Sequence, residues 1–168
     1  MLSRDIALDA YDRIEQVLRH AVDGLTAEQL EHRPAPDANS IAWLAWHLVR
    51  VQDDHIADAA GREQVWTAEG WVDRFGLPFD ASATGYGFSS AEVGQVRGVS
   101  AELLQGYAAA VHDRTAEFLR DLSDDDFDRV VDTRWDPPVT LGVRLVSVIS
   151  DGLQHAGQAA YARGLLPS

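Results

Sequence analysis

The sequence predicts an all-α protein folded as a four-helix bundle, with a long connection between the second and third helices. Four long segments repeat apolar residues at the helical period of about 3.6 residues. No segment alternates apolar and polar residues convincingly, as a strand with one exposed face would. The 168 residues contain no internal repeat and no linker, so we expect a single domain over residues 1–168.

The first helix is expected over about residues 2–22, with Ser3 as N-cap and Gly24 as its stop. A short helical turn follows at residues 25–30, where Thr26 and Gln29 form a capping-box pattern. The apolar residues of the first helix that share one face are Ile6, Ala10, Ile14, Val17, Leu18 and Ala21.

The second helix gives the clearest pattern and is expected from about Ile41 to Ala60. Asn39 or Ser40 caps it, and Gly61 ends it. Its first half is apolar almost all round, so it should lie deep in the bundle and carry His47 into the interior. Its second half, residues 50–58, is polar and should emerge towards solvent.

Residues 62–89 form a long irregular connection rich in aromatic side chains, with one short helix expected around residues 68–75. The aromatic content predicts packing against the body of the protein, over the mouth of a pocket. A helical turn at 90–96 precedes the third long helix, residues 100–122. A capped turn at 123–127 and a loop or short extended piece at 128–138 lead to the fourth, Thr140 to about Arg163.

Composition excludes several classes of function. The net charge of -13 disfavours binding to nucleic acids and to anionic membranes. The absence of cysteine removes disulfides, thiolate metal ligands and a cysteine nucleophile. No apolar run reaches the roughly 18 residues of a membrane span, and no secretory signal is visible, so a cytoplasmic location is the default. All 14 basic residues are arginine, which indicates a GC-rich genome.

Three residues form a candidate metal site. Asp151 and His155 lie four residues apart on the fourth helix and therefore share one face. His47, carried inward by the second helix, is the expected third ligand. A buried carboxylate needs a cation or donors, which a divalent ion supplies. Two imidazoles and a carboxylate suit Zn, Ni, Fe or Mn and leave positions open for a substrate. The alternative for His47 is a hydrogen-bonded core histidine.

Further residues are candidates for lining a pocket, although no catalytic group can be assigned from the sequence. Arg50 and Asp54 lie one and two turns beyond His47, and Gln158 lies one turn past His155. The alternative for Arg50 and Asp54 is that each forms a solvated salt bridge. The alternative for Gln158 is that it forms a hydrogen bond across helices. His55 is rotated away from His47 and is expected to be exposed. No phosphate-binding loop, nucleophile elbow or zincin motif is present.

Two stretches carry a resemblance to a known family: Ser40–Leu48, and Asp151–Gln158 followed by Tyr161–Gly164. They resemble the DinB-like superfamily of four-helix bundles, which includes mycothiol-dependent maleylpyruvate isomerase and bacillithiol S-transferases. Residues 135–142, Trp-Asp-Pro-Pro-Val-Thr-Leu-Gly, look like those of an uncharacterised actinobacterial branch. Family ligands are one histidine on helix two and a His-x-x-x-His or Glu-x-x-x-His pair on helix four. His47 and His155 match this pattern, whereas Asp151 replaces the usual histidine or glutamate.

The resemblance implies a metal-dependent enzyme that activates a low-molecular-weight thiol, such as mycothiol, towards a small electrophile. The outcome would be S-transfer or thiol-assisted isomerisation, and the family also implies a homodimer. The alternative is a non-catalytic, stress-associated bundle that binds a metal or a small ligand.

Overall fold

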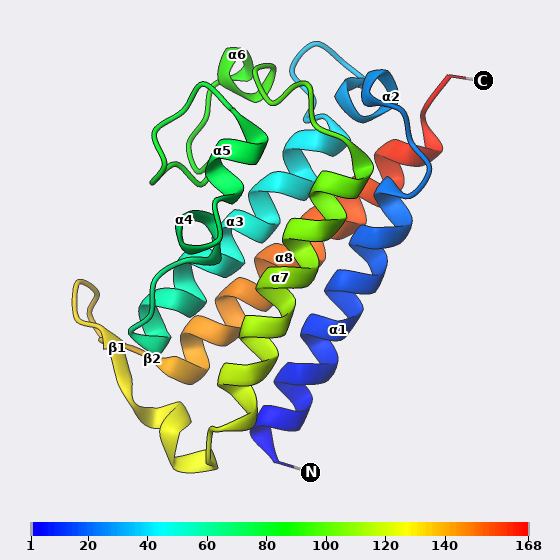
Figure 1. The fold of residues 1–168 in the computed structure, drawn as a ribbon. Coiled ribbons are helices and arrows are strands. Elements are labelled where there is room, and N and C mark those ends of the chain that lie inside the picture. The colour runs from blue at the N-terminus through cyan, green and yellow to red at the C-terminus, as the bar shows by residue number, and fades with distance from the viewer. Residues whose placement is uncertain (1, 168) are drawn as a thin grey trace.

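The computed structural model describes residues 2–167 and packs four long helices side by side (Figure 1). The all-α bundle is therefore confirmed. The long helices are α1 (Ser3–Val22), α3 (Ile41–Ala60), α7 (Ala101–Arg120) and α8 (Leu141–Gly164). The short helices are α2 (Ala27–Glu31), α4 (Val65–Ala68), α5 (Trp71–Phe75), α6 (Ser90–Val93) and the 3₁₀ helix η1 (Asp124–Asp128).

The extended piece expected before the fourth helix is a small hairpin. Strand β1 (Val130–Asp132) pairs antiparallel with β2 (Val139–Thr140), directly before α8. Within residues 2–167, no helix is both long and apolar enough to cross a membrane.

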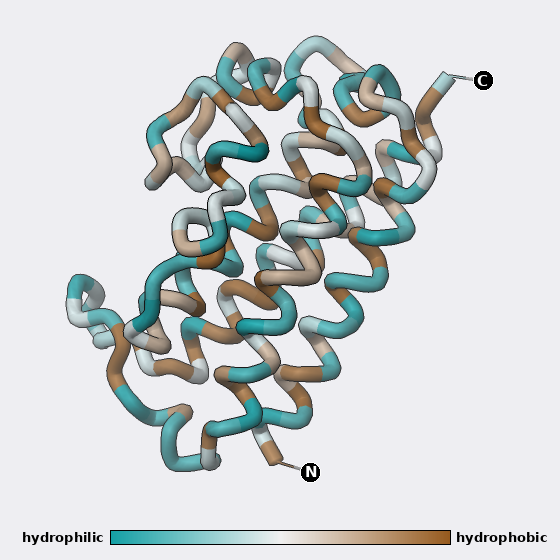
Figure 2. Tube along the Cα trace, viewed as in Figure 1, coloured by the Kyte–Doolittle hydropathy of each residue, from teal (hydrophilic) through white to brown (hydrophobic). Residues whose placement is uncertain are grey.

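The four long helices enclose one apolar core. Helices α1 and α3 each pack against both α7 and α8, so α1 and α3 lie diagonally across the bundle. Hydrophobic residues recur along every long helix (Figure 2). The core includes large side chains with almost no exposure, among them Tyr11, Trp46 and Tyr107. Burial of such apolar area is the main stabilising contribution to the fold.

The ends of α3 follow the predicted signals. The Ser40 hydroxyl accepts a hydrogen bond from the Trp43 amide at 3.1 Å, which caps the first turn. Gly61 ends the helix in the left-handed conformation, with φ of 64°. Ser100 and Thr140 cap α7 and α8 in the same way as Ser40 caps α3.

The start and the buried face of α1 differ from the prediction. Ser3 is the first helical residue rather than the N-cap, and its amide donates to the Asp124 carboxylate at 2.9 Å. An acidic side chain from η1 therefore caps α1 across the fold. Ile6 is 61% exposed, whereas Ala7 and Tyr11 are buried. Ala7 and Tyr11, rather than Ile6, therefore lie on the face of α1 that packs into the core.

The polar half of α3 does not emerge towards solvent, contrary to prediction. Gln52 and Asp53 are buried, and Arg50 has an exposed fraction of 0%. Residues 62–89 fold back over this half of the helix (Figure 1) and bring the aromatic side chains that cover it. The single short helix expected around residues 68–75 is two helices, α4 and α5, which meet at Gly70 with φ of 69°.

Candidate metal centre

His47 lies on the buried part of α3, where it is 4% exposed. Its Nδ1 lies 2.6 Å from the Thr84 carbonyl oxygen. A carbonyl only accepts hydrogen bonds, so Nδ1 carries the proton and Nε2 keeps a free lone pair. The Trp43 ring stacks on the imidazole with centroids 4.5 Å apart. Burial lowers the pKa of His47, although the Thr84 bond opposes this shift. The residue is therefore held as a neutral imidazole, the form that binds metals.

Gly85 lies directly against the His47 ring. A Cβ atom at this position would lie 2.9 Å from His47 Nδ1 and 3.0 Å from Trp46 Cζ3. Gly85 also has φ of 92°, which residues with a side chain rarely adopt. The chain can approach the imidazole this closely only because residue 85 has no side chain.

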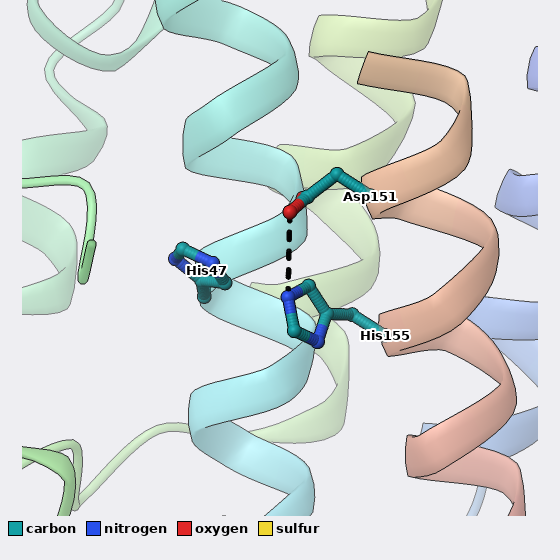
Figure 3. A group of neighbouring side chains, drawn as sticks. All are labelled: His47, Asp151 and His155. Atoms are coloured by element: carbon teal, nitrogen blue, oxygen red, sulfur yellow. Dashed lines mark ion pairs between the residues drawn. The ribbon is translucent and has the colours of Figure 1, made fainter. Parts of the chain in front are cut away.

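Asp151 and His155 lie one turn apart on α8, as predicted. His155 Nε2 is 3.4 Å from Asp151 Oδ1, and both side chains point towards His47 (Figure 3). The other ring nitrogen, Nδ1, donates to Gln158 Oε1 at 2.8 Å. The hydrogen bond with Asp151 raises the pKa of His155, and partial burial opposes the change. Asp151 Oδ2 is buried and has no hydrogen-bond partner among the described residues.

The three side chains converge as the sequence predicted. One ligand atom from each of His47, Asp151 and His155 lies within 4.8 Å of the other two. Ligand bonds of about 2.1 Å bring tetrahedral ligand atoms to about 3.4 Å apart, so closure needs a side-chain movement of about 1 Å. Asp151 Oδ2 has no hydrogen-bond partner in the described part of the chain, and each imidazole has its Nδ1 bonded to a carbonyl oxygen, which leaves its Nε2 for a metal. This donor set fits a divalent ion.

A cleft of about 670 Å³ opens beside this cluster. His47 and Asp151 line it, and so does Asp54, a candidate pocket residue from the sequence. His55 lines it as well, although it was expected to be rotated away. The remaining lining residues are Val51, Thr84, Tyr86, Asp132, Arg134, Trp135, Arg144, Ser147 and Val148.

Gln158 and Arg50 are not among the residues that line the cleft, but each contacts a residue of the candidate metal centre or the segment beside it. Gln158 orients His155 rather than lining the cavity. Arg50, the other candidate pocket residue, is fully buried beneath the connection and is not among the residues that line this cleft. Its guanidinium donates to the Ala83 and Ala81 carbonyls at 3.2 and 3.4 Å, so it holds the segment that presents the Thr84 carbonyl to His47. Arg50 therefore positions this segment against the candidate ligand His47.

The cleft contains residues that sequence reasoning missed. Thr84 and Gly85 lie in the irregular connection, where no periodic pattern indicates their neighbours. Asp132 and Arg134 come from the hairpin, which folds back against α8. Arg144 was detectable in principle, because it lies seven residues before Asp151 and so shares its helical face.

Comparisons with known proteins agree with this architecture. Residues 10–159 match the DinB superfamily. The chain is also similar to a solved structure of a conserved protein from Enterococcus faecalis, with a TM-score of 0.91 and 30% identity. The match covers 98% of this chain and 97% of that one. No curated protein matches the sequence.

Proposed function

The chain belongs to the DinB superfamily, and from this premise we propose that it is a metal-dependent enzyme acting on a small electrophile with a low-molecular-weight thiol. The observation that carries the proposal is the convergence of His47, Asp151 and His155 at the edge of a cleft. The volume of about 670 Å³ is within the usual range for small-molecule sites.

His47, Asp151 and His155 would hold Zn, Ni, Fe or Mn through two imidazole nitrogens and one carboxylate oxygen. When bound, such an ion lowers the pKa of a coordinated thiol and so supplies a nucleophile near neutral pH. Three protein ligands leave room for an exogenous group, as in catalytic rather than structural sites.

The protein side chains provide orientation and exclusion of water. Thr84 fixes the ring of His47, and Gln158 fixes that of His155, so both Nε2 atoms are directed before any ion binds. The Trp43 ring covers one face of His47 and keeps water from it. Because the chain has no cysteine, the sulfur nucleophile has to come from a separate thiol.

Mycothiol is the thiol we propose. Its support is the resemblance of residues 135–142 to an actinobacterial branch and the use of arginine for all 14 basic residues. We place the reaction in the cytoplasm, where small thiols are kept reduced. S-transfer and thiol-assisted isomerisation both begin with attack of the sulfur on an electrophilic carbon.

The test is an adduct assay. Wild-type protein loaded with Zn or Ni is mixed with mycothiol and a panel of epoxides, aryl halides and activated alkenes, and products are followed by mass spectrometry. We expect faster loss of thiol and electrophile than with the double variant His47→Ala, His155→Ala. If the two proteins behave alike with every electrophile, the enzyme proposal is refuted in favour of a non-catalytic binding bundle.

A homodimer is a further prediction from the family. Exposed apolar side chains along α8, namely Val143, Val146 and Tyr161, support it. Sedimentation velocity of the wild type and of Val146→Glu tests it, with a dimer expected only for the wild type. A monomeric wild type at micromolar concentration would refute it.

A further inference from the structure

The cleft has a second polar end, formed by Arg144 on α8. Arg144 lies seven residues before Asp151, so the two share one helical face, and their Cα atoms are about 10 Å apart along the axis. Both residues line the same cleft. A small molecule can therefore touch the guanidinium and the metal centre at the same time.

Asp132 holds Arg144 in place and is itself saturated by its partners. Its carboxylate accepts one hydrogen bond from Arg144 Nη2 at 2.8 Å. It also accepts three from Arg134, through the backbone amide, Nε and Nη2, at 2.8–2.9 Å. A carboxylate offers about four acceptor sites, so Asp132 has none left for the remaining donors of Arg144.

Arg144 keeps most of its hydrogen-bonding capacity unused. A guanidinium carries five N–H donors, and within residues 2–167 the Arg144 guanidinium makes one hydrogen bond and ion pair, to Asp132. Its side chain is only 15% exposed. Arg144 lines the cleft, so its remaining N–H donors are accessible to a molecule bound there. A ligand in the cleft can supply the acceptors that these donors lack among the described residues.

The surroundings favour a small carboxylate as that ligand. A planar guanidinium binds carboxylates through paired hydrogen bonds, and Trp135 beside it in the cleft offers an exposed apolar surface. Asp54, on the α3 side of the cleft, has one oxygen occupied by Gln64 at 2.8 Å. The negative charge of Asp54 would repel a second anionic group on the ligand. The cleft therefore favours a ligand with a single carboxylate.

We propose that Arg144, assisted by Arg134, binds the carboxylate of the electrophilic substrate, whose reacting carbon is thereby placed towards the metal centre. The identification of this carboxylate ligand as the substrate rests on the proposed function. The substrate class is a small monocarboxylic acid with an electrophilic carbon several bonds from the carboxylate. Trp135 packs against its apolar portion.

The first test measures binding without any metal, so that it does not depend on catalysis. Chelator-treated wild-type protein is titrated calorimetrically with benzoate, benzamide and inorganic phosphate. We expect benzoate to bind and benzamide to bind at least about tenfold more weakly, because a charged hydrogen-bonded pair contributes more than a neutral one. Arg144→Gln should lose the preference, Arg144→Lys should keep part of it, and Arg114→Gln, a charge change on the surface of α7, should keep all of it.

Two binding outcomes overturn the assignment. Equal binding of benzoate by wild type and Arg144→Gln would show that Arg144 is only a structural partner of Asp132. Tighter Arg144-dependent binding of phosphate than of benzoate would replace the carboxylate by a phosphate group. Thermal unfolding of each variant checks that the fold is retained.

A kinetic arm connects this site to the reaction. With metal-loaded protein and mycothiol, Arg144→Gln should raise KM for a carboxylate-bearing electrophile about tenfold or more and leave KM for its carboxamide analogue unchanged. An equal change for both analogues would contradict the proposal. If no electrophile reacts with the wild type, the proposed function fails, while the benzoate titration still decides the anion site.

Discussion

Replacing Gly85 by alanine should weaken metal binding, although residue 85 donates no ligand. The new Cβ would lie 2.9 Å from His47 Nδ1, well inside ordinary contact distance of about 3.5–4 Å. Relief requires the imidazole to move, which breaks its 2.6 Å hydrogen bond with Thr84. Loss of such orienting bonds typically lowers metal affinity by about 10–100-fold. Backbone strain at φ of 92° adds roughly 1–3 kcal/mol of destabilisation.

Gly87 provides a matched control for this substitution. It also has positive φ, 74°, but a Cβ there would meet nothing within 4 Å. Gly87→Ala should therefore lose stability in urea unfolding while its Zn affinity, measured by competition with an indicator, stays at the wild-type value. If Gly85→Ala binds Zn as tightly as Gly87→Ala, the close contact between Gly85 and the His47 ring does not orient the imidazole. That result would refute the predicted loss of metal affinity.

Gln158→Leu should lower Zn affinity by about 10–100-fold with little change in stability, because it removes the acceptor of an exposed His155 Nδ1–H; an unchanged affinity in the same titration would contradict this. Arg50→Met should cost about 3–5 kcal/mol in urea unfolding, since it leaves Asp53 buried without its cation, and a loss below about 1 kcal/mol would show that this buried ion pair is not needed for stability. In the metal-free protein, Asp151 raises the pKa of His155, so their pairing stabilises the fold fully below the unfolded-state pKa of about 6.5 and is lost as pH rises through the higher folded-state value. Wild type should therefore exceed Asp151→Asn in stability more at pH 6 than at pH 9, and an equal difference at both would refute the pairing.

The long helices and the Asp151–His155 half of the candidate site were predictable because both depend on local periodicity. The start and stop of α3 follow from Ser40 and Gly61, which act through their own backbone neighbours. Asp151 and His155 share a face by helical geometry alone. His47 needed one additional inference, namely that an apolar half-helix lies in the core.

The remaining features depend on contacts between segments far apart in the sequence. Arg50 looked solvated because its own helix is polar there, but its partners at Ala81 and Ala83 come from an irregular connection. The buried face of α1 includes Tyr11, whose hydroxyl-bearing ring does not belong to the aliphatic pattern that placed Ile6 inside. The anion site at Arg144 depends on Asp132, whose position follows from the pairing of β1 with β2.

The central claim is that His47, Asp151 and His155 hold one divalent ion. Elemental analysis of protein purified from Zn- or Ni-supplemented cultures tests it directly. We predict about one ion per chain in the wild type and in a control variant, His20→Ala, His32→Ala, and almost none in His47→Ala, His155→Ala. Equal metal content in the wild type and the His47→Ala, His155→Ala protein would contradict the account.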